Sequence, residues 1–78
     1  MITPEELERL RKERVEELIE MKRILKEKIE SVIREEIEKA QNTEEVYKAI
    51  ATAREKLEKD FWAMTRVKGE LRAILQLN

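Results

Sequence analysis

Residues 7–40 read LERLRKERVEELIEMKRILKEKIESVIREEIEKA and form one long amphipathic run. At about 100° per residue, the run places most of its large apolar residues on one stripe, at steps of three and four. Several stripe positions repeat every 11 residues, a period of about 3.67 residues per turn that predicts a nearly straight helix. The stripe consists of Leu10, Arg14, Leu18, Met21, Leu25, Ile29, Val32, Glu36 and Ala40.

The apolar surface of this helix is wider than one stripe. Val15, Ile19, Ile33 and Ile37 fall to one side of it, and Ile24 falls to the other. A helix that meets a single partner needs only a narrow apolar seam. The extra width indicates contacts with two neighbours, and it therefore predicts a helical bundle.

Two charged residues interrupt the stripe, and they lie at equal distances on either side of Leu25. If two copies of the helix pack antiparallel around Leu25, Arg14 of one copy faces Glu36 of the other. The alternative is that both side chains lean to the edge of the stripe and reach water. The first interpretation places a homo-oligomer interface on Leu10, Arg14, Leu18, Met21, Leu25, Ile29, Val32 and Glu36.

The beginning and the end of the first helix carry capping signals. Thr3 can act as N-cap, Pro4 suits the first helical position, and Glu6 completes a capping box. The next signal is Asn42 or Thr43, either of which can cap a second helix, and Asn42 also tolerates the left-handed conformation that ends a helix. We predict helices over about residues 4–41 and 44–76, joined by a tight turn. The alternative is one continuous helix of about 70 residues, because no Gly or Pro forces a turn here.

The second helix has its own apolar stripe. With a turn at residues 42–43, residue i is expected to oppose residue 85 − i, which matches the two stripes along most of their length. The predicted stripe consists of Val46, Ala49, Ile50, Ala53, Leu57, Phe61, Met64, Val67, Leu71, Ile74 and Leu75.

A second face of this helix carries residues that suit a contact with another molecule. Trp62 is a candidate anchor, and Gly69, the only glycine, would let another backbone approach closely. Gly69 has a cost, because a glycine inside a helix destabilises it by roughly 0.5–1 kcal/mol relative to alanine. The alternative is that Trp62 lies flat over long charged side chains and Gly69 has no role. The candidate partner face consists of Tyr47, Ala51, Trp62, Gly69 and Ala73.

Composition excludes or disfavours several classes of protein. The 78 residues suit one domain over residues 1–78, and the lack of Cys and His excludes disulfides, thiolate metal sites and the Glu-x-x-His motif of di-metal bundles. A net charge of −1 with both signs mixed disfavours nucleic acid and anionic membranes as partners. No apolar run could span a bilayer, and the first residues lack the features of a signal peptide, so we expect a cytoplasmic protein. With 45% charged residues, the chain resembles in composition a thermostable protein or a computational design.

No residue pattern indicates chemistry. Ser31 is the sole serine and has no identifiable base, and the glutamate clusters are typical of solvated helix faces. We therefore expect no catalytic residue, no cofactor and no metal. The sequence predicts an all-α, antiparallel two-helix hairpin that self-associates, as a dimeric four-helix bundle in the favoured arrangement. The predicted function is a non-enzymatic assembly module, such as a viral or phage assembly factor, a subunit organiser or a designed scaffold. The alternative is an adaptor hairpin that presents the Trp62 face to another protein or to nucleic acid.

Overall fold

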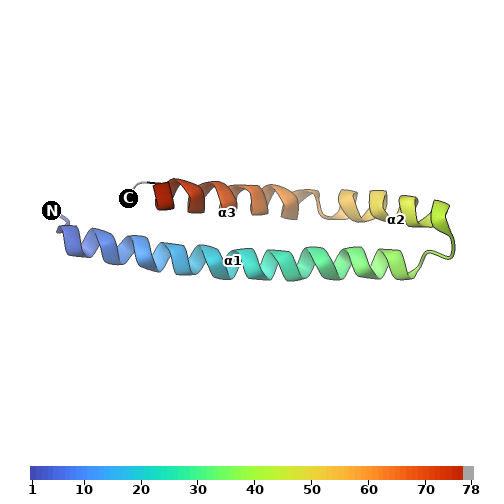
Figure 1. Cartoon of the computed structure of the whole chain (residues 1–78), viewed down its shortest axis with the longest axis horizontal. Coiled ribbons are helices and arrows are strands. Elements are labelled where there is room, and N and C mark those ends of the chain that lie inside the picture. The colour runs from blue at the N-terminus through green and yellow to red at the C-terminus, as the bar shows by residue number, and fades with distance from the viewer. Residues whose placement is uncertain (77–78) are drawn as a thin grey trace.

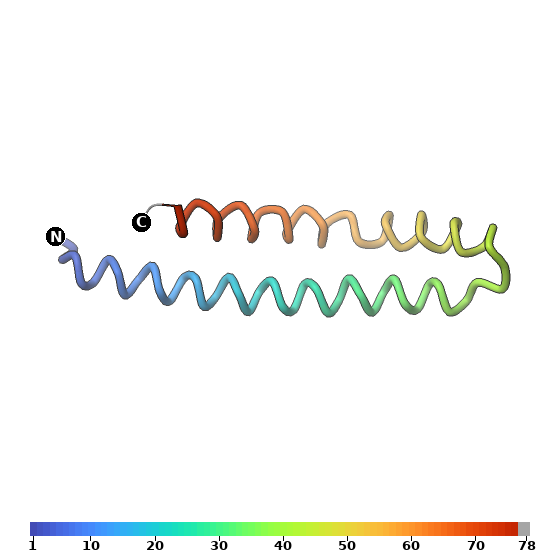
Figure 2. Tube along the Cα trace, in the orientation of Figure 1, coloured from blue at the N-terminus to red at the C-terminus, as the bar shows by residue number. Residues whose placement is uncertain are grey.

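The computed structural model describes residues 1–76, which form three helices in two antiparallel arms. Helix α1 (Pro4–Glu38) is the first arm, and helices α2 (Thr43–Lys56) and α3 (Glu58–Gln76) follow one another along the second arm (Figure 1). The N-terminus and the end of α3 lie at the same end of the molecule, opposite the turn (Figure 2). The predicted all-helical class is confirmed.

The predicted N-terminal cap of α1 is confirmed. Thr3 has an extended backbone, and its Oγ1 accepts a hydrogen bond from the backbone N–H of Glu6 at 3.2 Å. Pro4 occupies the first turn, where a missing N–H costs nothing, and Glu5 and Glu6 lie near the positive end of the helix dipole. Local sequence therefore determines where α1 begins.

Helix α1 ends at Glu38, three residues before the predicted end at about residue 41. The N–H groups of Lys39 and Ala40 donate to the carbonyls of Glu36 and Ile37, at 3.3 Å and 3.0 Å. These are the tight three-residue bonds that commonly close a last helical turn.

Asn42 is the N-cap of α2, as predicted, and its Oδ1 accepts from the N–H of Glu45 at 2.9 Å. In return, the Glu45 carboxylate accepts from the N–H of Gln41 at 2.7 Å. The φ of −151° and ψ of 173° of Asn42 are extended, so Asn42 does not adopt the left-handed conformation that it tolerates. The capping hydrogen bond requires that extended backbone.

The prediction of one second helix over residues 44–76 is wrong, because Leu57 separates α2 from α3 with φ −100° and ψ 8°. Hydrogen bonds continue through the break, from Leu57 N–H to Ala53 at 3.0 Å and from Phe61 N–H to Leu57 at 2.9 Å. Helix α3 therefore continues nearly in the direction of α2 (Figure 1). Ala49, Ala53 and Leu57 follow at steps of four, and each such step over-rotates by about 40°. The helix is interrupted at Leu57, the position at which this rotation would begin to turn the apolar stripe of α2 away from α1.

The core is a single seam between the two arms. Leu18 and Leu57 are its largest fully buried side chains, and the small Ala49 and Ala53 let α2 approach α1 closely. Met64 and Val67 continue the seam along α3. The predicted core stripe is wrong at Ile50, Phe61 and Leu75, whose exposed fractions are 40%, 41% and 61%. Each arm covers only one face of the other, so residues at the edge of a stripe stay in water.

We predict that Leu57→Ala destabilises the chain by about 2–5 kcal/mol, because it leaves a cavity in the seam. Urea unfolding followed by circular dichroism at one chain concentration measures the loss. Leu75→Ala is the matched control, since it removes the same atoms from an exposed position and should cost less than half as much. Equal losses for the two variants would contradict the assignment of the core.

Candidate interaction surfaces

Two exposed apolar sides flank the seam. The Phe61 side is defined by Ile19, Ile37, Ile50, Phe61 and Leu75, and the Trp62 side is defined by Leu10, Met21, Ile24 and Trp62. At about 100° per residue, the α1 members of the two sets fall on opposite edges of its buried stripe, whereas Phe61 and Trp62 lie about 100° apart on α3, with Trp62 nearer its outer face. All of these side chains are exposed, from 37% for Ile37 to 66% for Trp62. The chain therefore has apolar surface for neighbours on two sides.

A groove of about 430 Å³ runs between α1 and α3 on the Trp62 side. Leu18 and Val67 form its floor, since both are buried, and Met21 and Trp62 flank it. Its other lining residues are Arg14, Lys59, Ala63, Arg66 and Glu70. The groove thus combines an apolar floor with charged edges.

Arg14 and Glu70 tie α1 to α3 beside this groove. Arg14 donates from Nε to Glu70 Oε1 at 2.7 Å and from Nη2 to Oε2 at 2.9 Å, a two-point pair that fixes the orientation of both side chains. Arg14 Nη1 also lies 3.0 Å from Glu17 Oε1. The hydrogen bond from Arg14 lowers the pKa of Glu70, and the bonds to Glu70 and Glu17 raise the pKa of Arg14. The predicted register places residue 71 opposite residue 14, which agrees with this pair to within one residue, whereas Lys28–Asp60 and Glu36–Lys56 depart from it by three and seven residues.

Glu36 is the buried charged residue of the seam, with 9% of its surface exposed. Lys56 Nζ donates to Glu36 Oε1 at 2.5 Å, and Lys39 Nζ approaches the same oxygen at 3.5 Å. The hydrogen bond from Lys56 is the main cause of the lowered pKa of Glu36, and burial opposes it. Both charges of the stripe therefore have partners within the chain, and the contact between Arg14 and Glu36 of two copies stays a prediction.

The predicted oligomer stripe of α1 mostly faces the chain's own second arm. Leu18 is fully buried, and Leu25, Ile29 and Val32 are half-buried. Leu10 and Met21 remain exposed at 46% and 40%. In this closed arrangement only the edge of the stripe is open to another molecule.

The predicted partner face lies on the outer surface of the second arm. Its five residues are all exposed, with Tyr47 at 71% and Trp62 at 66%. A Cβ built on Gly69 meets nothing within 4 Å, so no part of the chain itself requires a glycine there. A shallow groove beside Trp62 is lined by Arg54, Glu58, Phe61, Trp62 and Thr65.

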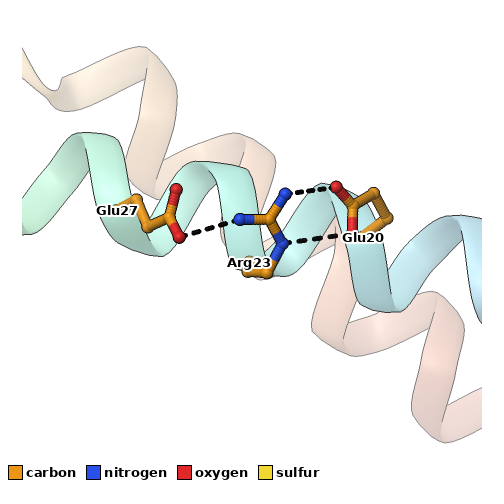
Figure 3. A network of polar contacts seen from close by, with 3 residues as sticks. All are labelled: Glu20, Arg23 and Glu27. Atoms are coloured by element: carbon orange, nitrogen blue, oxygen red, sulfur yellow. Dashed lines mark hydrogen bonds and ion pairs between the residues drawn. The ribbon is translucent and has the colours of Figure 1, made fainter.

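The outer face of α1 is charged. Arg23 lies between Glu20 and Glu27 (Figure 3), donating to both Glu20 oxygens and to Glu27 Oε1 at 2.8 Å. The hydrogen bond from Arg23 lowers the pKa of Glu20. The three side chains are 55–65% exposed, and such solvated pairs add little stability. This face lacks the apolar surface that a stable contact needs.

Within residues 1–76, no three His, Cys, Asp or Glu side chains gather to hold a metal ion. None of the helices in this range combines the length and the apolar character that crossing a membrane requires. The features that the described chain offers are therefore its open grooves and the two apolar sides.

Comparison with protein-family models, with curated proteins and with solved structures finds no significant match for this chain. The functional argument therefore depends on the geometry and surface chemistry of the molecule itself.

We predict that Glu36 makes the chain sensitive to acid. Because its pKa in the folded chain lies below the ordinary 4.5, the Glu36–Lys56 pair stabilises the fold above that pH. The contribution is lost as the pH falls through the lowered pKa. Glu36→Gln should therefore flatten the loss of unfolding free energy between about pH 5 and pH 2. Urea unfolding across this range measures it, with the exposed Glu30→Gln as control; parallel curves for wild type and Glu36→Gln would refute the prediction.

We predict that Gly69→Ala stabilises the chain by roughly 0.5–1 kcal/mol, because alanine restricts the unfolded chain and favours the helix. Its Cβ would enter open space. Thermal unfolding measures the effect, and Ala73→Gly is the reciprocal control that should destabilise by a similar amount. A destabilising Gly69→Ala would show that another backbone does approach at this position.

Proposed function

We propose that this chain is a non-enzymatic structural module, a helical hairpin whose product is an assembly of its own copies. The favoured assembly is a dimeric four-helix bundle. Such a module would serve as an assembly factor, as an organiser of other subunits or as a scaffold, and it needs no cofactor or metal. Exposed surface is the observation that carries the proposal.

The chain exposes more surface than a compact protein of its size. Its accessible surface is 6754 Å², whereas folded monomers of 9.4 kDa expose about 5,000 Å². Its radius of gyration is 17.7 Å, against about 11–12 Å for a compact domain of this length. The surplus area is of the order that a subunit loses when it joins a bundle.

The distribution of apolar residues supports the same proposal. Within residues 1–76, six hydrophobic side chains are buried and thirteen large ones are exposed. Two packed helices bury only one stripe each, which leaves the other faces of both helices in water. Chains below about 80 residues commonly obtain the missing core through oligomerisation, a metal or disulfides. This chain has no cysteine, and oligomerisation is the route that its surface suits.

An exchange of second arms between two copies would make the predicted α1 stripe part of the oligomer interface. If two copies exchanged their second arms, the contacts that now join α1 to α2 and α3 would instead join two chains. Leu18, Leu25, Ile29 and Val32 would then contribute to the oligomer without a change of neighbours. The closed hairpin would instead associate through its two exposed sides.

An adaptor role is the second candidate, and the Trp62 face favours it. A solvent-exposed Trp beside small residues on an outer helix face is the kind of anchor that protein interfaces use. In this role, Tyr47, Ala51, Trp62, Gly69 and Ala73 would bind another protein, or less favourably nucleic acid, since the net charge is −1. Gly69→Ala then separates the candidates, because a close-packed partner would be lost and a self-assembly that avoids Gly69 would persist.

We predict a particle of two or more chains in solution. Light scattering across a dilution series should give a mass of at least twice 9.4 kDa at micromolar concentration. The midpoint of urea unfolding should rise with chain concentration, because dissociation accompanies unfolding. A helical chain that stays monomeric at all concentrations would refute the assembly role and favour the adaptor.

A further inference from the structure

We propose that a second copy of this chain docks on the Trp62 side, with α1 of each copy against α3 of the other. The two-fold axis then runs parallel to the arms, and both turns lie at the same end of the dimer. This inference rests on the proposed function, because it assumes that the chain self-associates. It names the surface and the orientation that the assembly uses.

Trp62 supplies the centre of the proposed contact. The pairs Arg14–Glu70 and Lys28–Asp60 show which residues of the two arms lie at the same height along the long axis. By this alignment, Trp62 lies beside residues 22–26 of α1. Met21 and Ile24, exposed at 40% and 52%, occupy this level on the same side. A large aromatic near the middle of a surface and beside a groove is typical of interface anchors. In the proposed dimer, Trp62 of each copy covers Met21 and Ile24 of the other.

Charge complementarity selects α3 as the neighbour of α1. Lys59 and Arg66 line the α3 edge of the groove, and neither forms an ion pair within residues 1–76. The α1 edge carries Glu17, whose side chain is 61% exposed although it also contacts Arg14. With α1 against the partner's α3, Arg66 of one copy approaches Glu17 of the other. The basic Lys28 on this side is already paired with Asp60 at 3.0 Å.

The opposite orientation brings like charges together. If the turns lay at opposite ends, α3 would face α3 of the other copy, with Trp62 at the centre. Lys59 would then lie opposite Thr65 of the other copy, one position from Arg66. Like charges placed opposite each other at an interface oppose association. The parallel two-fold axis avoids this contact.

The Phe61 side is a poorer surface for a second copy. Lys22 of α1 and Lys68 and Arg72 of α3 line one groove there, so both arms present basic residues. With both turns at the same end, Lys22 of one copy would lie near Lys68 of the other, although Glu8, Glu30 and Glu38 line other grooves on this side. On the Trp62 side, the basic residues without an ion pair are Lys59 and Arg66 of α3, and α1 carries the exposed Glu17, which is an arrangement that a two-fold pair can satisfy.

The proposed surface is large enough for a stable dimer. The molecule measures 60 × 17 × 15 Å, and one long side of it exceeds the roughly 800 Å² per partner that a standard interface buries. A second copy is therefore a fitting occupant, since it has the same length and the complementary edges.

Trp62 is the only tryptophan, so its fluorescence reports directly on this surface. We expect its emission to shift to shorter wavelength as chain concentration rises, in step with the mass measured by light scattering. A dimer whose tryptophan emission stays that of a solvated side chain would overturn the proposed surface and leave self-association standing. A chain that is monomeric at all concentrations would overturn both.

Charge exchange tests the orientation. Arg66→Glu alone and Glu17→Lys alone should each weaken the dimer by roughly tenfold or more, because like charges then meet at both symmetric contacts. An equimolar mixture of the two variants should recover the wild-type mass, since each altered edge then faces its complement. Sedimentation velocity measures all three samples, and circular dichroism confirms that each variant is helical.

Arg72→Glu is the matched control, because it makes the same change on α3 but at the Phe61 side, and it should leave the dimer intact. Recovery in the mixture supports the pairing of α1 with the partner's α3. Weakened variants that do not recover when mixed would overturn this orientation. Unweakened variants of a dimeric wild type would overturn the surface as well.

Discussion

The contact between α1 and the second arm is the constraint on which the remainder of the structure depends. Leu18 and Leu57 are fully buried in it, and the alanines of α2 bring the backbones close. Two helices can share only one seam, and each must leave its flanks in water. The elongated shape, the large accessible surface and the two apolar sides all follow from this geometry. The narrow seam, which leaves these sides exposed, is the geometric basis of the proposed assembly role.

Charged pairs align the two arms at three levels. Glu36–Lys56 lies toward the turn, Lys28–Asp60 near the middle and Arg14–Glu70 toward the open end. An apolar stripe with a helical repeat permits a slip of one turn, but a slip would separate all three pairs. The acidic partners of Lys28 and Lys56 have side chains that are only 13% and 11% exposed. Partly buried pairs of this kind specify register more reliably than they add stability.

Most of the local structure could be predicted, because its causes are local. Thr3 and Asn42 cap α1 and α2 through hydrogen bonds to residues three positions on, which a sequence pattern shows directly. The break at Leu57 carries no Gly or Pro and could not be foreseen from propensity. Phe61 and Leu75 belong to the apolar stripe of the second arm by spacing but stay exposed, because α1 does not cover that edge of the stripe.

The all-helical class, the start of each arm and the apolar width of the first helix can be read from the sequence, because they depend on periodicity and capping within a few residues. It also indicated that Trp62 lies off the buried stripe, since angular position on a helix follows from spacing alone. The ion-pair partners of Arg14 and Glu36 depend on the tertiary structure. Glu70 and Lys56 lie 56 and 20 residues away from them along the chain, so no local pattern links these pairs. The groove between α1 and α3 on the Trp62 side likewise depends on the fold, because its walls come from both arms and its shape depends on how closely they pack.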